Sequence, residues 1–434
     1  MTGTKKIPRI INHFLDTDLY KLSMCLMVIT NDPEMEVEYE FVDRDNRVYP
    51  KGFDDELKEQ IQMMRDIVIT EPEIDFLRRK CYYFPEFFMT FLRGFRFDPN
   101  GFDISQDAEG HLKMKFRGSW FEKILWEVML MAIISELYYI MTGLSEHFDY
   151  DEYYKMTYEK GIRLLEAGCV FSDFGTRRRA SFKTQETAVR ALYDAYRSRD
   201  WSETGGKFVG SSNPWFCMTI GSEIGGLTPV GTMAHEACCA YAGIMGGFTQ
   251  ANKILMDKWS NTYRGALGVY LFDSGGFDIF VNNVTTKDLL MYRGLRVDSY
   301  DNYEITDKIV DLYKSHDIDA KTKQVVYSNA LDTDRTIELH KYASQFVLDS
   351  YGIGTHFTND WAPIFQKKGL DIIIKALNMV IKLVAVRLNN KDFWKDTCKL
   401  SGDPGKAVGK KSCIVRFMEQ LPEYAERVKT IFKQ

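Results

Sequence analysis

The chain has 434 residues, of which 45% are hydrophobic and 27% are charged, and its formal net charge is −5. This length predicts about two domains, and the composition is that of a folded globular protein, which excludes a disordered chain. The charges are spread without long basic blocks, so the sequence offers no cationic patch of the kind that binds nucleic acid.

The first part of the chain, residues 1–145, predicts a mixture of helices and strands. DTDLYKLSM begins a helix, for which simple capping by Asp18 and packing of Tyr20 are the favoured interpretation. Alternating polar and apolar residues at 34–44 and 111–118 predict two strands.

The most apolar segment, residues 124–141, is interrupted by Glu127 and Glu136 and falls short of about 20 unbroken apolar residues. It therefore predicts a buried helix rather than a membrane span. The N-terminus has no long apolar run after its two lysines, which disfavours a secretory signal. We expect a cytoplasmic protein with no membrane partner.

From residue 168 onward, short β-rich runs end in small or polar residues and alternate with helical stretches. This alternation predicts parallel strands joined by crossover helices, in an irregular TIM-like α/β barrel that spans residues 146–375. The seven runs lie at 169–179, 207–213, 227–236, 267–276, 293–301, 323–332 and 348–357. Because the C-terminal ends of barrel strands meet on one face, we expect the following to be neighbours: Arg177, Ser211, His235, Asp273, Asp298, Asn329 and Gly354.

After the barrel, residues 378–388 predict a strand and residues 401–411 a Gly/Pro loop. No linker marks a domain boundary. We therefore expect residues 376–434 to return to residues 1–145 and to build one discontinuous α+β domain with them.

Two of these strand ends carry groups suited to anions. In SDFGTRRRAS, planar guanidinium groups suit phosphate or carboxylate, and we retain Phe174, Gly175 and Arg177 as candidates against a solvated basic turn. In SYGIGTHF, the glycines allow backbone N–H groups to approach a phosphate, although a tight turn alone would also explain them.

Two aspartates, Asp273 in LFDSGGFD and Asp298 in RVDSYD, directly follow apolar strands. Each suits a hydroxyl or metal ligand, or a helix cap. The eight cysteines are scattered without a CxxC pair, which argues against a disulfide framework and a structural zinc site, and adjacent Cys238 and Cys239 would point about 100° apart on a helix.

GTMAHE places His235 at a predicted helix start. An isolated histidine is commonly a satisfied core residue, but here it can be neutral, oriented and nucleophilic near neutral pH. The adjacent Glu236 could orient the ring, hold Mg²⁺ or simply interact with the helix dipole.

FGTRRRAS, GTMAHE, the DS of RVDSYD, YSNALD, SYGIGT and KLSGDPGK occur in the order found in the nicotinate phosphoribosyltransferase family, which the chain resembles from about residue 10 to 410. The resemblance implies the type II phosphoribosyltransferase fold and the condensation of nicotinate with 5-phosphoribosyl 1-pyrophosphate. It also implies Mg²⁺, coupling to ATP hydrolysis through phosphorylation of His235, and a homodimer with shared active sites.

Residue by residue, the resemblance implies that Phe174 stacks on one face of the pyridine ring and Tyr20 of a partner subunit on the other. Arg177 and Arg296 are expected to meet phosphate or carboxylate oxygens, Asp298 and Asp273 the ribose hydroxyls or Mg²⁺, and the 352–355 backbone the 5′-phosphate. We thus predict catalysis by His235, Asp298 and Arg177, and substrate binding by Tyr20, Phe174, Ser211, Ser212, Thr232, Asp273, Arg296, Asn329, Gly352, Gly354 and Thr355.

One residue departs from the family pattern, because Tyr300 follows the DS pair where glycine is common, which affects the expected contact of Ser299. A nicotinamide phosphoribosyltransferase is the nearest alternative. Hydroxyls of Ser211 and Ser212, with Asn213, can donate to a carboxylate and favour nicotinate. A nucleic-acid-binding module is opposed by the net charge, and a metal-dependent barrel hydrolase by the absence of HxH or HExxH.

Overall fold

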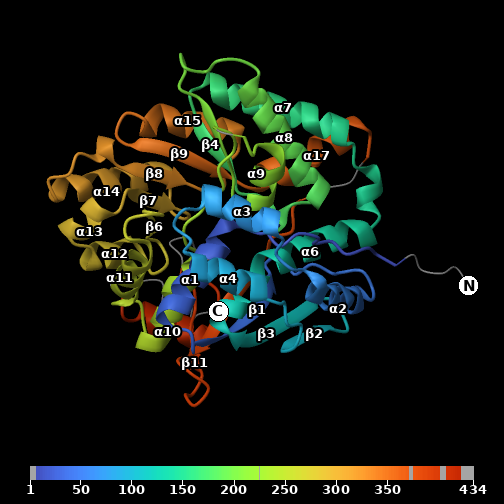
Figure 1. The fold of residues 1–434 in the computed structure, drawn as a ribbon, viewed down its shortest axis with the longest axis horizontal. Helices are drawn as coiled ribbons and strands as arrows, with labels where there is room; N and C mark the ends of the chain where they lie inside the picture. Colours follow the sequence, from blue (N-terminus) through green and yellow to red (C-terminus); the bar gives the residue numbers. More distant parts are fainter. Residues whose placement is uncertain (1–5, 224, 371–374, 401–406, 422–434) are drawn as a thin grey trace, which may run out of the picture.

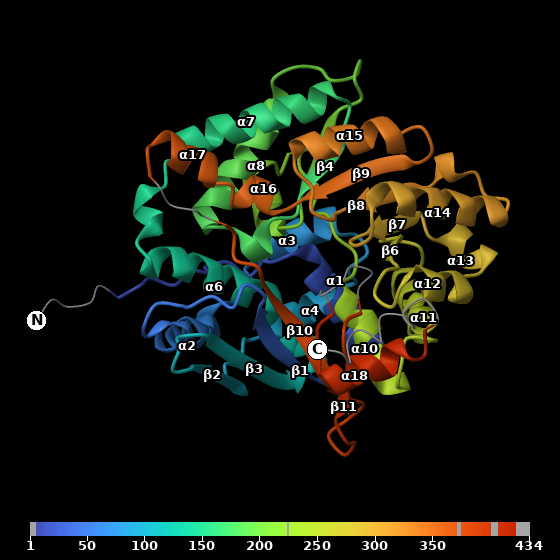
Figure 2. The ribbon, with the colours of Figure 1, turned by 180° about the vertical axis from the view of Figure 1, so that it is seen from behind.

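The computed structural model describes residues 6–223, 225–370, 375–400 and 407–421. It contains a six-stranded parallel sheet and a five-stranded antiparallel sheet, with helices around and between them (Figures 1 and 2). This architecture confirms the predicted α/β fold with a second α+β domain.

The parallel sheet is the barrel predicted from the repeating runs. Its order is β5-β4-β9-β8-β7-β6, so the last strand along the chain pairs with the first. Its strands are β4 (Val170–Asp173), β5 (Lys207–Ser211), β6 (Val269–Leu271), β7 (Gly294–Val297), β8 (Gln324–Tyr327) and β9 (Leu348–Ile353).

An extended segment, residues 228–232, bridges the two edge strands β5 and β6. The backbone N–H groups of Thr228 and Val230 each donate to a carbonyl of β5 over 3.0 Å, and Thr232 Oγ1 donates to the Val269 carbonyl of β6 over 2.8 Å. The sheet is thereby closed into an irregular barrel.

The prediction of a strand at 227–236 was wrong, although the other six runs each contain one. Pro229 has no N–H to donate to a ladder, and Gly231 adopts a φ of +145°. The chain can therefore close the barrel here without forming regular pairs on both sides.

The antiparallel sheet joins the two ends of the chain. Its order is β11-β10-β1-β3-β2, and β10 pairs with β1 from Glu36 opposite Arg387 to Asp43 opposite Met379. Its strands are β1 (Glu36–Asp43), β2 (Phe102–Gln106), β3 (Leu112–Ser119), β10 (Met379–Arg387) and β11 (Lys395–Asp396). This pairing confirms the discontinuous domain, whereas its boundaries at 145 and 376 stay predictions. The first six residues of the predicted loop at 401–411 lie outside the described residues.

Helices α8, α7, α15 and α14 pack side by side around the outside of the barrel, and α10 packs on β10 (Figures 1 and 2). The helices are α1 (Leu19–Asn31), α2 (Phe53–Met63), α3 (Glu71–Lys80), α4 (Glu86–Gly94), α5 (Trp120–Lys123), α6 (Trp126–Met141), α7 (Tyr150–Glu166), α8 (Phe182–Arg197), α9 (Pro214–Ile220), α10 (His235–Met245), α11 (Ala251–Tyr263), α12 (Phe277–Asn283), α13 (Thr286–Met291), α14 (Asn302–Ser315), α15 (Thr333–Ala343), α16 (Thr355–Thr358), α17 (Ala362–Lys367) and α18 (Lys411–Met418).

The apolar stretch Trp120–Met141 is long and apolar enough to cross a membrane by length and composition, but 78% of its most apolar window is buried inside the protein. Most residues of α6 are buried, including Glu127. The segment is therefore the core helix that the sequence predicted.

The segment before α1 is bonded to the barrel of the same chain. Both oxygens of Asp16 accept from the buried guanidinium of Arg179, over 2.6 and 2.7 Å. Asp18 lies at the N-cap of α1, but its carboxylate accepts from Ser212 Oγ over 2.6 Å and makes no capping bond. The predicted capping by Asp18 was therefore wrong, because its carboxylate accepts a hydrogen bond from a barrel hydroxyl instead of from the helix backbone.

Candidate active site

A cavity of about 410 Å³ lies where residues that follow the barrel strands face β10 of the antiparallel sheet. It is large enough for a small substrate and polar in character. Of the predicted site residues, those that line it are Tyr20, Phe174, Arg177, His235, Arg296, Asp298, Asn329, Gly352, Gly354 and Thr355.

His235 is the first residue of α10, and 6% of its surface is exposed. Its Nε2 lies 2.9 Å from Asp298 Oδ2 and its Nδ1 lies 3.0 Å from Ser274 Oγ. Burial, followed by the charge of Lys399, lowers the pKa of His235 to about 4, against the opposing effect of Asp273 and Asp298. The imidazole is therefore neutral near pH 7 and held on both sides, as the sequence led us to expect.

Asp298 is the acidic partner of His235 in the cavity. Its Oδ1 accepts from Ser328 Oγ over 2.8 Å, and Arg296 Nη2 lies 3.5 Å from its Oδ2. Burial acts to raise the pKa of Asp298, but Arg296 and His235 outweigh it and hold this pKa well below its usual range. Asp298 is therefore an ionised acceptor for the His235 Nε2–H.

Asp273 lies behind His235 and does not line the cavity. Its Oδ2 accepts from Ser299 Oγ and, over 3.3 Å, from the Asp298 N–H. Its buried Oδ1 has no hydrogen-bond partner among the described residues and lies 3.6 Å from His235 Nδ1. Asp273 thus supports the residues around the histidine, and its expected contact with the ribose hydroxyls or Mg²⁺ stays a prediction.

Two aromatic rings, Phe174 and Tyr20, line the same cavity. A Cβ on Gly352 would lie within 2.3 Å of the Phe174 ring, so the glycine provides the space in which that ring packs. Tyr20 lies in the cavity of its own chain, where Leu19 next to it donates to the Ser212 carbonyl over 2.7 Å. This position differs from the expected contribution of Tyr20 by a partner subunit.

Three predicted substrate contacts are engaged elsewhere. Ser211 Oγ donates to Asp173 over 2.6 Å, Ser212 Oγ donates to Asp18 over 2.6 Å, and Thr232 Oγ1 donates to a β6 carbonyl. None of them lines the cavity. Buried carboxylates of this chain accept the protons of the two serine hydroxyls, so their donation to the substrate carboxylate stays a prediction that this arrangement does not favour.

The cavity also contains basic residues that we did not predict: Arg44, Arg178, Lys382 and Lys399. Within the described residues, the side chains of Arg44, Arg177, Arg178 and Lys382 form no ion pair with a carboxylate. Burial, followed by the charge of Lys399, lowers the pKa of Lys382 to about 7. A lysine inside the apolar run MVIKLVAV was a signal that the sequence offered.

The carboxylate of Glu236 points to a buried group of side chains rather than to the histidine ring. It pairs with the fully buried Lys21, which also pairs with Glu127, and it accepts from Tyr39 OH over 2.6 Å and Trp120 Nε1 over 3.1 Å. Of the three alternatives for Glu236, ring orientation is therefore wrong. The contacts tie α10 to α1, α6 and β1.

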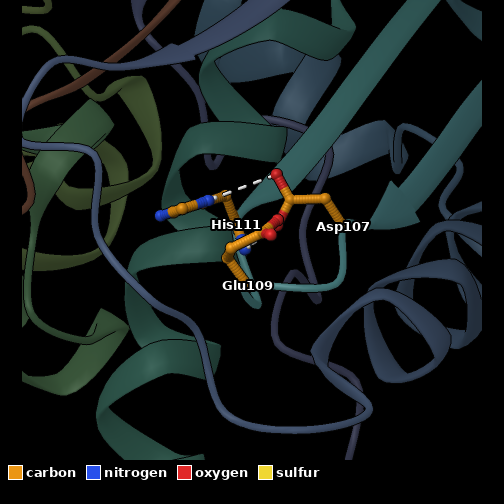
Figure 3. A group of neighbouring side chains, drawn as sticks. All are labelled: Asp107, Glu109 and His111. Atoms are coloured by element: carbon orange, nitrogen blue, oxygen red, sulfur yellow. Dashed lines mark hydrogen bonds and ion pairs between the residues drawn. The ribbon is translucent and has the colours of Figure 1, made fainter.

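A possible metal-ligand group lies elsewhere, in the hairpin between β2 and β3. Ligand atoms of Asp107, Glu109 and His111 lie within 4.8 Å of one another (Figure 3). Asp107 accepts from the His111 N–H over 2.8 Å and lies 3.2 Å from its Nδ1. These hydrogen bonds explain the closeness of the three residues as a feature of the hairpin turn. None of the three lines the cavity.

Comparison with known proteins places this site in context. Residues 169–423 match the model of the nicotinate phosphoribosyltransferase (NAPRTase) family, and residues 15–135 match that of its N-terminal domain. A nicotinate phosphoribosyltransferase of Desulforapulum autotrophicum is 34% identical over 92% of this chain and 96% of its own length. One of Methanosarcina acetivorans is 31% identical over 93% and 96%. The crystal structure of nicotinate phosphoribosyltransferase from Porphyromonas gingivalis superposes with a TM-score of 0.85 at 32% identity, covering 95% of this chain and 100% of that one.

Proposed function

Because the chain belongs to the nicotinate phosphoribosyltransferase family, we propose that it joins nicotinate to 5-phosphoribosyl 1-pyrophosphate, which yields nicotinate mononucleotide and pyrophosphate for NAD biosynthesis. The observation that carries the proposal is the cavity, in which two aromatic rings, a neutral histidine and guanidinium groups without an ion pair to a described carboxylate face a common space. The relatives reported above are named for nicotinate, and none supports the nicotinamide alternative.

Nicotinate fits the part of the cavity near Phe174 and Tyr20, whose rings suit stacking on a pyridine. With the serine hydroxyls engaged, the cavity donors for its carboxylate are the arginines Arg177 and Arg296. A guanidinium donates paired N–H groups to a carboxylate. The NH₂ of a carboxamide is itself a donor, so a guanidinium facing it places donor against donor. Nicotinate is therefore favoured over nicotinamide by charge and donor pattern.

The unpaired cations suit the pyrophosphate. The reaction separates a cationic ribosyl group from pyrophosphate, so positive charge near the leaving group and an anion near the sugar stabilise the transition state. Arg44, Arg178 and Lys382 supply the positive charge near the leaving group. Asp298 supplies the anion near the sugar. Asp298 also fits Mg²⁺, because it stays ionised in the cavity and carboxylate oxygens are the ligands that this ion prefers. When bound, Mg²⁺ neutralises charge on the pyrophosphate.

We assign ATP as co-substrate and His235 as the phosphorylated residue. Nε2 lies on the cavity side of the ring, beside Asp298, whereas Nδ1 faces the interior residues Ser274 and Asp273. Attack by Nε2 on the γ-phosphoryl group of ATP forms an N–P bond, releases ADP and passes the Nε2 proton to the adjacent Asp298. The eight buried cysteines, none in a disulfide, fit a reducing compartment such as the cytoplasm.

A product assay with nicotinate or nicotinamide, with and without ATP, tests the proposal. We expect nicotinate mononucleotide, formed faster with ATP, and an acid-labile, base-stable label on the protein from γ-labelled ATP. His235→Asn keeps some hydrogen bonding but cannot form the phosphoramidate, so it should lose both the label and the stimulation by ATP. Equal turnover of nicotinamide would contradict the assigned base, and a label that persists in His235→Asn would contradict the assigned residue.

A further inference from the structure

Tyr300 connects the two loops that hold His235. It follows β7 in the loop of Asp298 and Ser299, and its hydroxyl accepts the N–H of Phe277 over 3.0 Å. Phe277 is the first residue of α12, which begins directly after the loop of Asp273 and Ser274.

This hydroxyl supplies a bond that α12 does not obtain from its own cap. The N-cap of α12 is Gly276, which has no side chain, and the first N–H groups of a helix have no partner within it. The β6–α12 loop is thus fixed at its C-terminal end by a tyrosine of the neighbouring loop.

The backbone of Tyr300 is in the left-handed region, with a φ of +73°. This conformation costs free energy for any residue other than glycine, and it persists only where surrounding contacts impose it. Here the Tyr300 carbonyl accepts from Asn329 Nδ2 over 3.2 Å, while the hydroxyl binds α12. Through its backbone carbonyl and its hydroxyl, Tyr300 therefore joins its own loop after β7 to the loops that follow β8 and β6.

Among the described residues, the hydrogen-bond partners of the His235 ring and the carboxylates beside it belong to the two loops that Tyr300 connects. Ser274 and Asp273 face Nδ1 from one loop, and Asp298 faces Nε2 from the other. A small shift between the loops would change both contacts together. We propose that Tyr300 is a positioning residue for His235, and that its hydroxyl holds the histidine ring in the geometry required for phosphoryl transfer.

This inference rests on the proposed phosphorylation of His235, and three variants separate its parts. Tyr300→Phe removes the hydroxyl and keeps the ring and the left-handed backbone. Tyr300→Gly removes the hydroxyl but relieves the backbone. Tyr303→Phe is the matched control, because Tyr303 is an exposed residue on α14 that packs against Tyr342 instead of joining the loops.

The first measurement is the rate at which γ-labelled ATP labels the protein. A misplaced reacting group costs up to about 100-fold in rate, so we expect labelling of Tyr300→Phe to slow roughly tenfold or more. Labelling of Tyr300→Gly should slow equally, and its KM for nicotinate should be unchanged. Tyr303→Phe should be labelled at the wild-type rate. Wild-type labelling rates in Tyr300→Phe would overturn the inference, and so would an equal loss in all three variants.

A second measurement does not depend on ATP. The ¹⁵N signals of the His235 ring, assigned with His235→Asn, report the hydrogen bonds at Nδ1 and Nε2. Both signals should move in Tyr300→Phe and Tyr300→Gly and stay in place in Tyr303→Phe. If they do not move, Tyr300 does not position the ring. Absence of label on the wild-type protein would contradict the proposed phosphorylation alone, and the ring signals would still decide whether Tyr300 orients His235.

Discussion

At the scale of single residues, the packing of Phe174 depends on the absence of a side chain at position 352. A Cβ there would lie 2.3 and 2.4 Å from two ring atoms, so Gly352→Ala should displace the ring. Loss of an aromatic stacking partner is worth about 1 kcal/mol, which predicts a KM for nicotinate raised roughly fivefold. Steady-state kinetics with varied nicotinate would measure it. Gly94→Ala is the control, because a Cβ at Gly94 has no atom within 4 Å.

Lys382 should couple pyrophosphate binding to proton uptake. Its pKa of about 7, lowered by burial and Lys399, leaves it largely neutral at pH 8 and charged at pH 6. A bound anion raises this pKa, because it favours the charged form. Binding at pH 8 should therefore take up a proton that binding at pH 6 does not.

Calorimetry of pyrophosphate binding in buffers of different ionisation enthalpy measures this uptake. Lys382→Met should remove the part that depends on the lysine, and the difference from the wild type cancels the titration of pyrophosphate itself. An equal uptake by wild type and Lys382→Met at pH 8 would show that another group takes the proton.

Residue types identified the site more reliably than they identified each contact. His235 and Asp298 follow predicted elements and carry ionisable groups, so their convergence could be predicted. The engagement of Ser212 by Asp18 could not, because the two residues are far apart in sequence and only the folded chain brings them together. Arg179 likewise has the same sequence context as Arg177 but forms a buried ion pair with Asp16.

At the scale of elements, Lys21 joins three helices through two buried carboxylates, Glu127 of α6 and Glu236 of α10. Lys21→Met leaves both carboxylates without their cation, and breaking a buried pair in this way costs about 3–5 kcal/mol. Glu236→Gln should cost less, because Lys21 keeps Glu127. Thermal unfolding followed by circular dichroism should show the larger loss for Lys21→Met.

The double variant Lys21→Met with Glu236→Gln provides the check. With one buried carboxylate remaining instead of two, it should be more stable than Lys21→Met alone. A double variant that loses the sum of the two single effects would show that the three charges do not act as a group.

The spacing of apolar residues predicted helix or strand correctly where the element buries one or both of its faces. The alternation of EVEYEFVD predicted β1, whose Val37, Tyr39 and Phe41 are buried. The run at 227–236 has the same β-rich composition, but Pro229 and Gly231 prevent a ladder. The closure of the barrel by an irregular segment depends on its neighbours β5 and β6, which a local pattern does not contain.

At the scale of the whole molecule, the antiparallel sheet brings the last part of the chain to the active site. β10 pairs with β1 and places Lys382 in the cavity opposite the residues of the barrel. The sequence predicted that the two ends meet, because no linker marks a domain boundary. It did not predict that the cavity lies between the barrel and β10, since the pairing partner of a strand is not visible in the strand's own sequence.

The position of Tyr20 predicts that each chain contains a complete site. Tyr20 lies in its own cavity, and the residues on either side of it are fixed within the same chain by Lys21 with Glu236 and by Leu19 with Ser212. In a mixture of Tyr20→Ala and His235→Ala chains, every site then lacks one of the two residues. Co-expression with two different affinity tags, followed by purification on both, would isolate any mixed dimer.

We expect such a mixed species, if the chain forms a homodimer at all, to be as inactive as its parents. A wild-type chain paired with either variant serves as the control and should retain the activity of its own site. Recovery in the Tyr20→Ala and His235→Ala pair would mean that Tyr20 reaches the partner's cavity, which requires the bonds of Leu19 and Lys21 to form between chains. Inactivity with demonstrated pairing would instead show that the N-terminal segment completes the cavity of its own chain, so that any dimer contact leaves the two sites independent.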